Sequence, residues 1–164
     1  MISLKGLYLI NLNFFKKKMW LSTVLIIIFL TQVTFVMIKM HPHQNVYFNS
    51  FAGNNLLNKF EKDYWGLSNK QAFEYILAND SKELIMIGSA NPISLENSKQ
   101  ILSKKQKKRI KISENAAADY IIENYTNWSG KYKKKQYLIP SNFKTYKDII
   151  VNGNKISSIY KKEI

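Results

Sequence analysis

The sequence has no cysteine and few acidic residues, which limits the kinds of metal and catalytic site that it can form. Its 164 residues include 11 Asp and Glu, 2 His, 6 Gly and 3 Pro. Without cysteine, the chain has no disulfide framework, no thiolate zinc site and no thiol nucleophile. A glycine-rich phosphate loop is also missing, because Gly88-Ser89-Ala90 alone is too little to predict a nucleotide site. No complete active site is visible, so we assign no catalytic residue.

Basic residues, in contrast, are abundant. The 25 Lys and Arg give a formal net charge of +14, which points to nucleic acid or lipid headgroups as a neighbour. The chain is also rich in Ile, Asn and Lys, the bias that an AT-rich genome imposes, and this explains much of the charge. Apolar residues make up 46%, an ordinary share for a folded protein, and the length predicts about one domain.

Most of the apolar excess lies in residues 19–38, a run without one ionisable side chain. As a helix this run spans roughly 30 Å, the thickness of the hydrocarbon core of a bilayer, so it predicts a transmembrane helix. It is longer than the apolar core of a cleaved signal peptide, and residues 39–42 are a poor cleavage site. A buried helix of a soluble core is the less favoured alternative. We expect its Ser and Thr hydroxyls to bond carbonyls one turn earlier, and Gln32 to face another helix.

The flanking lysines predict the orientation of this helix. Lys16, Lys17 and Lys18 precede it, and Lys39 alone follows it. The positive-inside rule therefore makes residues 1–18 a short cytoplasmic or interfacial segment and places everything after the helix outside. The lipid bilayer is then a partner, and nucleic acid is not.

Past the apolar run, the pattern changes to short alternating elements. Residues 39–67 are expected to form a juxtamembrane segment rich in aromatic side chains, and residues 68–164 a small α/β domain. About 120 residues suffice for an independent core of modest size.

Two helices are predicted in this domain from their start signals. Ser68 followed by Gln71 reads as a capping box that opens a helix ending near Asn79. Ser94 is predicted to cap a second helix that ends near Ser103.

The strands follow from short apolar runs between turn residues. Asn152-Gly153 is a two-residue hairpin signal between KDIIV and KISSIY. The other predicted strands cover residues 84–88, 109–112 and 119–125. The fold class is therefore a membrane-anchored α/β protein, with one transmembrane helix, a mixed sheet and a C-terminal hairpin. Its first two strands are expected to be parallel through a helical crossover.

Candidate ligand residues are sparse. His41 and His43 have the spacing that points two imidazoles the same way on an extended chain, and Asp63 is the nearest carboxylate. Zinc requires three or four ligands, so we predict no metal site. Two basic clusters, residues 104–109 and 131–135, read as a phosphate-binding patch, as a contact with anionic headgroups, or as solvated loops.

Aromatic and amide residues gather in VYFN (residues 46–49) and EKDYWG (residues 61–66). Aromatic side chains beside a membrane exit are commonly interface anchors. The alternative is a site for a sugar or a headgroup, in which aromatic faces stack on pyranose rings and Asp63 and Asn49 hydrogen-bond to hydroxyls. Asp63 as a general base lacks a second carboxylate at a recognisable spacing.

The passage from Lys39 to Leu77 resembles the C-terminal region of bacterial multi-pass glycosyltransferases. Their superfamily contains the dolichyl-phosphate-mannose–protein mannosyltransferases and the lipid A aminoarabinose transferases. The match rests on the paired VYFN and DYWG blocks, and the chain departs from the usual pattern at His43 and Asn54. The matching residues, whose roles the resemblance leaves open, are His41, Pro42, Tyr47, Phe48, Asn49, Gly53, Asp63, Tyr64, Trp65 and Gly66.

The resemblance implies an enzyme that moves a sugar from a polyprenyl phosphate to an acceptor outside the bacterial inner (plasma) membrane. The acidic catalytic residues of the family lie in an early external loop that this chain lacks, so none is carried over. We therefore expect a C-terminal fragment with a periplasmic or extracellular domain, partnered by upstream transmembrane helices and inactive alone. The chain itself needs no cofactor, and a divalent metal in the full enzyme stays open. The alternative is a single-pass anchored module that binds a glycan or a protein without catalysis.

Overall fold

The computed structural model describes residues 5–6, 19–46, 61–125 and 137–163. The chain forms two compact units, Met1–His41 and Pro42–Ile164. The first contains one long apolar helix, and the second contains a small mixed sheet with helices.

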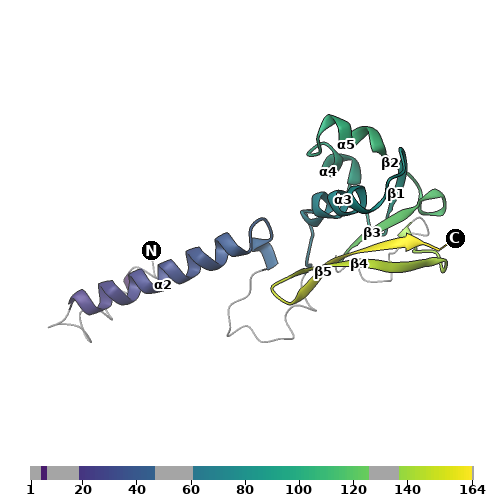
Figure 1. Ribbon diagram of the computed structural model, residues 1–164. Coiled ribbons are helices and arrows are strands. Elements are labelled where there is room, and N and C mark those ends of the chain that lie inside the picture. Colours follow the sequence, from purple (N-terminus) through teal and green to yellow (C-terminus); the bar gives the residue numbers. More distant parts are fainter. Residues whose placement is uncertain (1–4, 7–18, 47–60, 126–136, 164) are drawn as a thin grey trace. The chain divides into compact units, whose positions relative to one another are not determined.

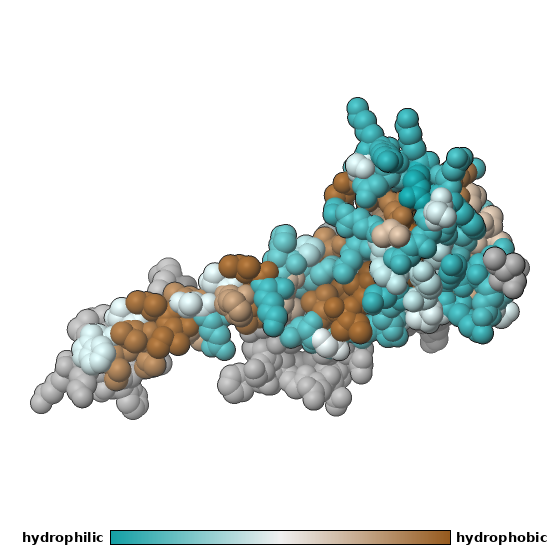
Figure 2. Space-filling view, viewed as in Figure 1, coloured by the Kyte–Doolittle hydropathy of each residue, from teal (hydrophilic) through white to brown (hydrophobic). Residues whose placement is uncertain are grey.

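Helix α2 covers Met19–Lys39 and is 21 residues long. The Thr31 hydroxyl donates a hydrogen bond of 2.8 Å to the Ile27 carbonyl, as expected for a hydroxyl that bonds one turn back. The helix is long and apolar enough to cross a membrane, and a signal sequence near an N-terminus has the same properties. Its large apolar side chains are exposed, and much of its surface is brown in Figure 2.

The second unit contains a five-stranded sheet in the order β2-β1-β3-β5-β4 (Figure 1). Strands β2, β1 and β3 are parallel, whereas β5 runs antiparallel to both β3 and β4. The predicted mixed sheet with a parallel first pair is confirmed. The strands are β1 (Ile85–Ser89), β2 (Ile110–Ile112), β3 (Tyr120–Asn124), β4 (Phe143–Val151) and β5 (Asn154–Lys162).

The predicted C-terminal hairpin is also confirmed. Asn152 and Gly153 connect β4 to β5 with φ values of 49° and 78°. Positive φ at both central residues is the signature of a type I′ turn, whose twist matches that of the flanking strands.

The helices follow the sequence signals in part. Helix α3 (Ser68–Asn79) has the predicted bounds, and Ser94 caps helix α4 (Leu95–Lys99) as expected. The prediction that α4 continues to Ser103 is wrong, because Ser103 takes an extended conformation and opens a separate helix, α5 (Lys104–Arg109). Two short 3-10 helices, η1 (Gln44–Val46) and η3 (Asn115–Ala117), complete the described elements.

The two faces of the sheet are covered differently. Tyr120 and Asn124 of β3 both hydrogen-bond to side chains at the ends of α3, so α3 lies on their face. Ile121 points to the opposite face, because side chains alternate along a strand. On that face a buried apolar cluster is made of Ala90, Ala118, Ile121 and Phe143.

The connections that follow β1 and β2 leave the sheet on opposite faces. Helix α4, after β1, contacts α3. Helix η3, after β2, packs on Gly88, where an added Cβ would lie 2.2 Å from Asn115 Oδ1. Gly88 pairs with Ile121 in the sheet, so η3 lies on the face away from α3. The carboxyl ends of β1 and β2 therefore form a topological switch point.

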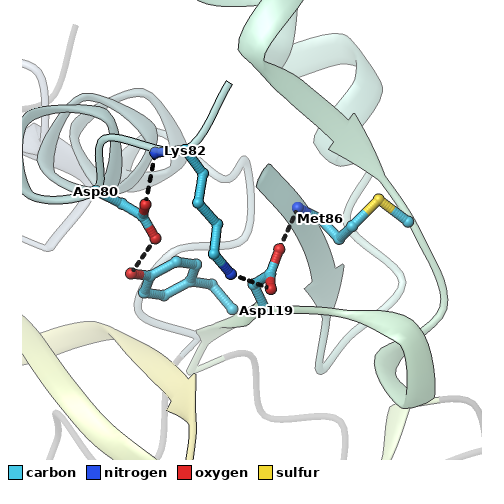
Figure 3. Close-up of polar contacts among 5 residues, drawn as sticks. Asp80, Lys82, Met86 and Asp119 are labelled. Atoms are coloured by element: carbon cyan, nitrogen blue, oxygen red, sulfur yellow. Dashed lines mark hydrogen bonds and ion pairs between the residues drawn. The ribbon is translucent and has the colours of Figure 1, made fainter. Parts of the chain in front are cut away.

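The amino ends of the parallel strands are fixed by a group of polar contacts (Figure 3). Asp80, just after α3, accepts hydrogen bonds of 2.9 Å from both the Tyr120 hydroxyl and the Lys82 backbone N–H. Asp119 accepts one of 2.8 Å from the Met86 N–H and pairs with Lys82 Nζ at 2.8 Å. Burial, then the bond to Asp80, raise the pKa of Tyr120, so its hydroxyl remains a donor at neutral pH.

We predict that the contacts of Asp80 stabilise the domain more when its carboxylate is ionised than when it is protonated. Burial would raise the pKa of Asp80, but hydrogen bonds from Lys82 and Tyr120 and the Lys82 charge hold it below its usual value of 3.8. The resulting stability is present above about pH 4 and is lost as the pH falls through the lowered pKa. Asp80→Asn should therefore lower the free energy of unfolding by about 1 kcal/mol at pH 7 and by less at pH 3.

Denaturant unfolding of both proteins at the two pH values, followed by near-ultraviolet circular dichroism, measures this difference. The exposed carboxylate of Glu83 provides the matched control. Glu83→Gln should change the free energy of unfolding by the same small amount at both pH values. An equal loss for Asp80→Asn at pH 7 and pH 3 would contradict the prediction.

Candidate functional site

Asp63, the acidic residue of the DYWG block, is a buried structural carboxylate. Its side chain is fully buried. It accepts hydrogen bonds from the backbone N–H of Leu67 at 2.8 Å and of Ser68 at 3.2 Å. The Ser68 hydroxyl and Asn124 Nδ2 donate two more, at 2.5 and 2.6 Å. The carboxylate is thus committed to four donors of its own chain and is inaccessible to a substrate.

These bonds also determine how helix α3 begins. The expected capping box is wrong, because the N-cap position is Leu67 and no side chain caps the helix from there. The Ser68 hydroxyl donates to Asp63 instead. A carboxylate binds the free N–H groups of a first helical turn more strongly than a neutral hydroxyl does, so Asp63 replaces the local cap.

Asn124 connects this helix start to the sheet. Its Nδ2 lies within 3.1 Å of Asp63 Oδ2, Ser68 Oγ and Asn69 Oδ1. Its side-chain and backbone oxygens accept from Asn91 Nδ2 at 3.2 and 3.1 Å. Because an amide nitrogen has two hydrogens, one of them is shared between acceptors. Asn124 therefore links residue 63, α3, β3 and the loop after β1 through buried hydrogen bonds.

Gly66 completes the same turn. Its φ is +64°, and an added Cβ would lie 2.6 Å from Asn69 Nδ2 and 2.7 Å from Ile93 Cγ2. Only glycine fits this left-handed and crowded position. The turn also contains a backbone hydrogen bond of 3.0 Å from Gly66 N to Asp63 O.

Between Asp63 and Gly66, the two aromatic side chains of the block point outward. Tyr64 is 49% and Trp65 72% exposed. Their rings meet edge to face, with 5.0 Å between centroids and 89° between planes. The DYWG block therefore has a buried structural half and an exposed aromatic half, and only the exposed half is available for binding.

Of the remaining sequence-predicted residues, the structure describes His41, Pro42 and His43. His41 and Pro42 are exposed, and His43 is buried. Tyr47, Phe48, Asn49 and Gly53 lie outside the described residues. In the parts of the chain that the structure describes, no three His, Asp or Glu side chains gather to hold a metal ion. One link from the preceding segment is described, a hydrogen bond of 3.2 Å from Asn45 Nδ2 to the Lys62 carbonyl.

Lysines of β4 and β5 lie over tyrosine rings of α3, β3 and β4, a feature that sequence reasoning missed. Lys161 Nζ lies 5.6 Å from the ring centroid of Tyr120 and 5.0 Å from that of Tyr146. Lys147 Nζ lies 5.5 Å from the Tyr75 ring. Such distances are in the range of favourable cation–π contacts. Because two of these rings come from α3 and β3, far from the lysines in sequence, no local pattern shows the contacts, which engage part of the basic excess within the domain.

Comparisons with known proteins give no family for the chain. No protein family matches it, and no curated protein and no solved structure is significantly similar to it. The resemblance to membrane glycosyltransferases therefore stays a prediction from the residues that carry it.

The division of the DYWG block can be tested by stability alone. Asp63→Asn leaves one oxygen in place of two, so its NH2 group must face either the Leu67 N–H or the donors of Ser68 and Asn124. Buried donors left without partners cost the full desolvation penalty, so the loss should be on the order of 3 kcal/mol. Trp65→Ala, two residues away, is the matched control and should change stability by less than about 0.5 kcal/mol. Equal unfolding free energies for both variants would refute the assigned roles.

Proposed function

We propose that this chain is the C-terminal, extracytoplasmic portion of an integral-membrane glycosyltransferase that uses a polyprenyl-phosphate sugar donor. In this proposal α2 is the last membrane helix. The α/β domain lies on the outer side of the membrane and contributes no catalytic group.

The observation that carries the proposal is the unburied apolar surface of α2. The described part of the chain buries 6% of the apolar span Trp20–Lys39. Exposing a large apolar side chain to water costs about 1.5–3 kcal/mol, so lipid or other helices must cover a surface made of many such side chains. Three lysines before the helix and one after it favour delivery of the domain to the outer side.

The exposed aromatic pair also supports a position at the membrane. Tyr64 and Trp65 follow the end of α2 by about 25 residues of sequence, and amphipathic rings favour the headgroup level of a bilayer. We propose that the buried Asp63 turn presents this pair to the membrane surface, where a lipid-linked sugar is also found.

A single-pass binding module is the second candidate. The buried hydrogen bonds of Asp63 and Asn124 are satisfied within Pro42–Ile164, so the domain needs no other chain to complete this part of its interior. A self-contained domain on one membrane helix fits a module that binds a glycan or a protein without catalysis.

Membrane anchoring and orientation are tested first. Alkaline phosphatase fused after Ile164 should be active and resist carbonate extraction, whereas a fusion after Lys18, which lacks the helix, should be inactive. Release of the chain by carbonate would mean that the helix is a cleaved signal sequence or part of a soluble protein, and it would contradict the membrane anchor. The transferase assignment requires membranes of the native host to lose transfer from polyprenyl-phosphate donors when the chain is deleted. Unchanged transfer would leave the binding module as the function.

The position of the aromatic pair gives a separate prediction. In a chain carrying Trp20→Phe and Trp128→Phe, Trp65 is the remaining tryptophan. Its fluorescence should be quenched by brominated lipids in nanodiscs, because an interfacial indole lies within contact of the upper acyl chain.

The control places tryptophan at the other end of α3. Leu84 is 50% exposed and precedes β1, beyond the carboxyl end of that helix. With Trp65→Phe and Leu84→Trp added, quenching by brominated lipid should be weak and quenching by acrylamide strong. The same pattern for Trp65 itself would contradict membrane contact.

A further inference from the structure

The switch point between β1 and β2 opens a cleft that sequence analysis did not identify. The chain leaves β1 toward α3 and leaves β2 toward the opposite face, so the described connections diverge at the carboxyl ends of these strands. In α/β sheets, ligands bind in the crevice at such a point. A cleft of about 610 Å³ lies there, between the start of α4 and the residues that enter η3.

Several polar groups of the cleft wall are used to build it. Asn91 donates to Asn124 and accepts from the Ile93 N–H. Ser89 donates to the Asn91 carbonyl, and Asn115 donates to the Leu138 carbonyl. These side chains hold the loops in place, so the cleft has rigid walls before any ligand arrives.

Other polar groups of the cleft wall include Glu96, Glu114 and Ser113. Glu96 and Glu114 are exposed and line the cleft from its two sides. Ser113 Oγ is buried and has no hydrogen-bond partner among the described residues, while its backbone N–H is bonded to the Ile87 carbonyl at 3.0 Å. A buried hydroxyl without a partner is destabilising unless a ligand or water satisfies it. Among the described residues that line the cleft, the ionisable side chains are the carboxylates of Glu96 and Glu114 and the phenol of Tyr137, although the whole chain carries a net charge of +14.

We infer that this cleft binds a neutral saccharide unit. The Glu96 and Glu114 carboxylates accept hydrogen bonds from sugar hydroxyls, and Ser113 completes its hydrogen bonding with one of them. Pro92 and Ile112 offer apolar surface to the C–H face of a pyranose ring. The two carboxylates repel a phosphorylated sugar, and the apolar wall disfavours a small, strongly hydrated cation. The inference holds for the transferase portion and for a lone binding module, so its failure is separate from that of the proposed function.

The test uses the full chain in lauryldimethylamine oxide, a detergent without a sugar headgroup. The neutral probes are methyl α-mannoside, methyl β-glucoside, N-acetylglucosamine and its tetramer. Mannose 6-phosphate and spermidine test for an anionic and a cationic ligand instead. NMR titration to about 50 mM detects binding weaker than 1 mM. At least one neutral sugar should bind, and mannose 6-phosphate should bind roughly tenfold more weakly than the methyl mannoside.

Variants locate the site. Glu114→Gln and Ser113→Ala should each lower the affinity for the bound sugar by about tenfold or more. This is the loss expected for a hydrogen bond to a charged or buried group. Glu83→Gln, exposed and outside the cleft, should leave affinity unchanged, and near-ultraviolet circular dichroism shows that each variant is folded. The inference is overturned if no neutral sugar binds, if mannose 6-phosphate or spermidine binds more tightly, or if affinity survives both cleft substitutions.

Discussion

The buried Asp63 carboxylate is the interaction on which the rest of the domain depends. A carboxylate without water is stable only when donors surround it, and here the donors come from the first turn of α3 and from Asn124 of β3. One side chain therefore begins the main helix and attaches it to the central sheet. Because Asn124 also binds Asn91, the loop that forms one wall of the cleft is positioned by the same network.

The parallel strands are held at both ends by different chemistry. At the carboxyl ends, neutral amide and hydroxyl groups donate hydrogen bonds to the Asp63 carboxylate. Both Asp63 and Asn124 are buried. At the amino ends, Asp80 and Asp119 are partly exposed and depend on Lys82 and the Tyr120 hydroxyl. The buried end specifies one geometry, whereas the exposed end responds to pH and salt.

Local signals were sufficient for most of the elements. Apolar runs located β1 and β3, Asn152-Gly153 gave the hairpin, and the bounds of α3 followed from its residues. The start of α3 was assigned to the wrong cap, because the true acceptor for Ser68 is Asp63, held in place by Asn124, 61 residues away, and no local pattern shows such a partner. Helix α5 was missed although Ser103 and Gln106 form a readable capping box. The cleft was invisible because Ser113 and Glu96 approach each other only through the parallel pairing of β1 with β2.

The net charge is a poor guide to the partners of this domain. Arg109 donates to the carbonyls at the end of α3, Lys82 pairs with Asp119, and Lys161 lies over two tyrosine rings. These side chains are held by contacts within the domain, so they are less available to bond directly to an external anion, although their charge still counts in the sum. The cleft at the switch point is lined by the opposite sign. In the inferred site, the described groups that recognise a ligand are therefore two glutamates and the Ser113 hydroxyl.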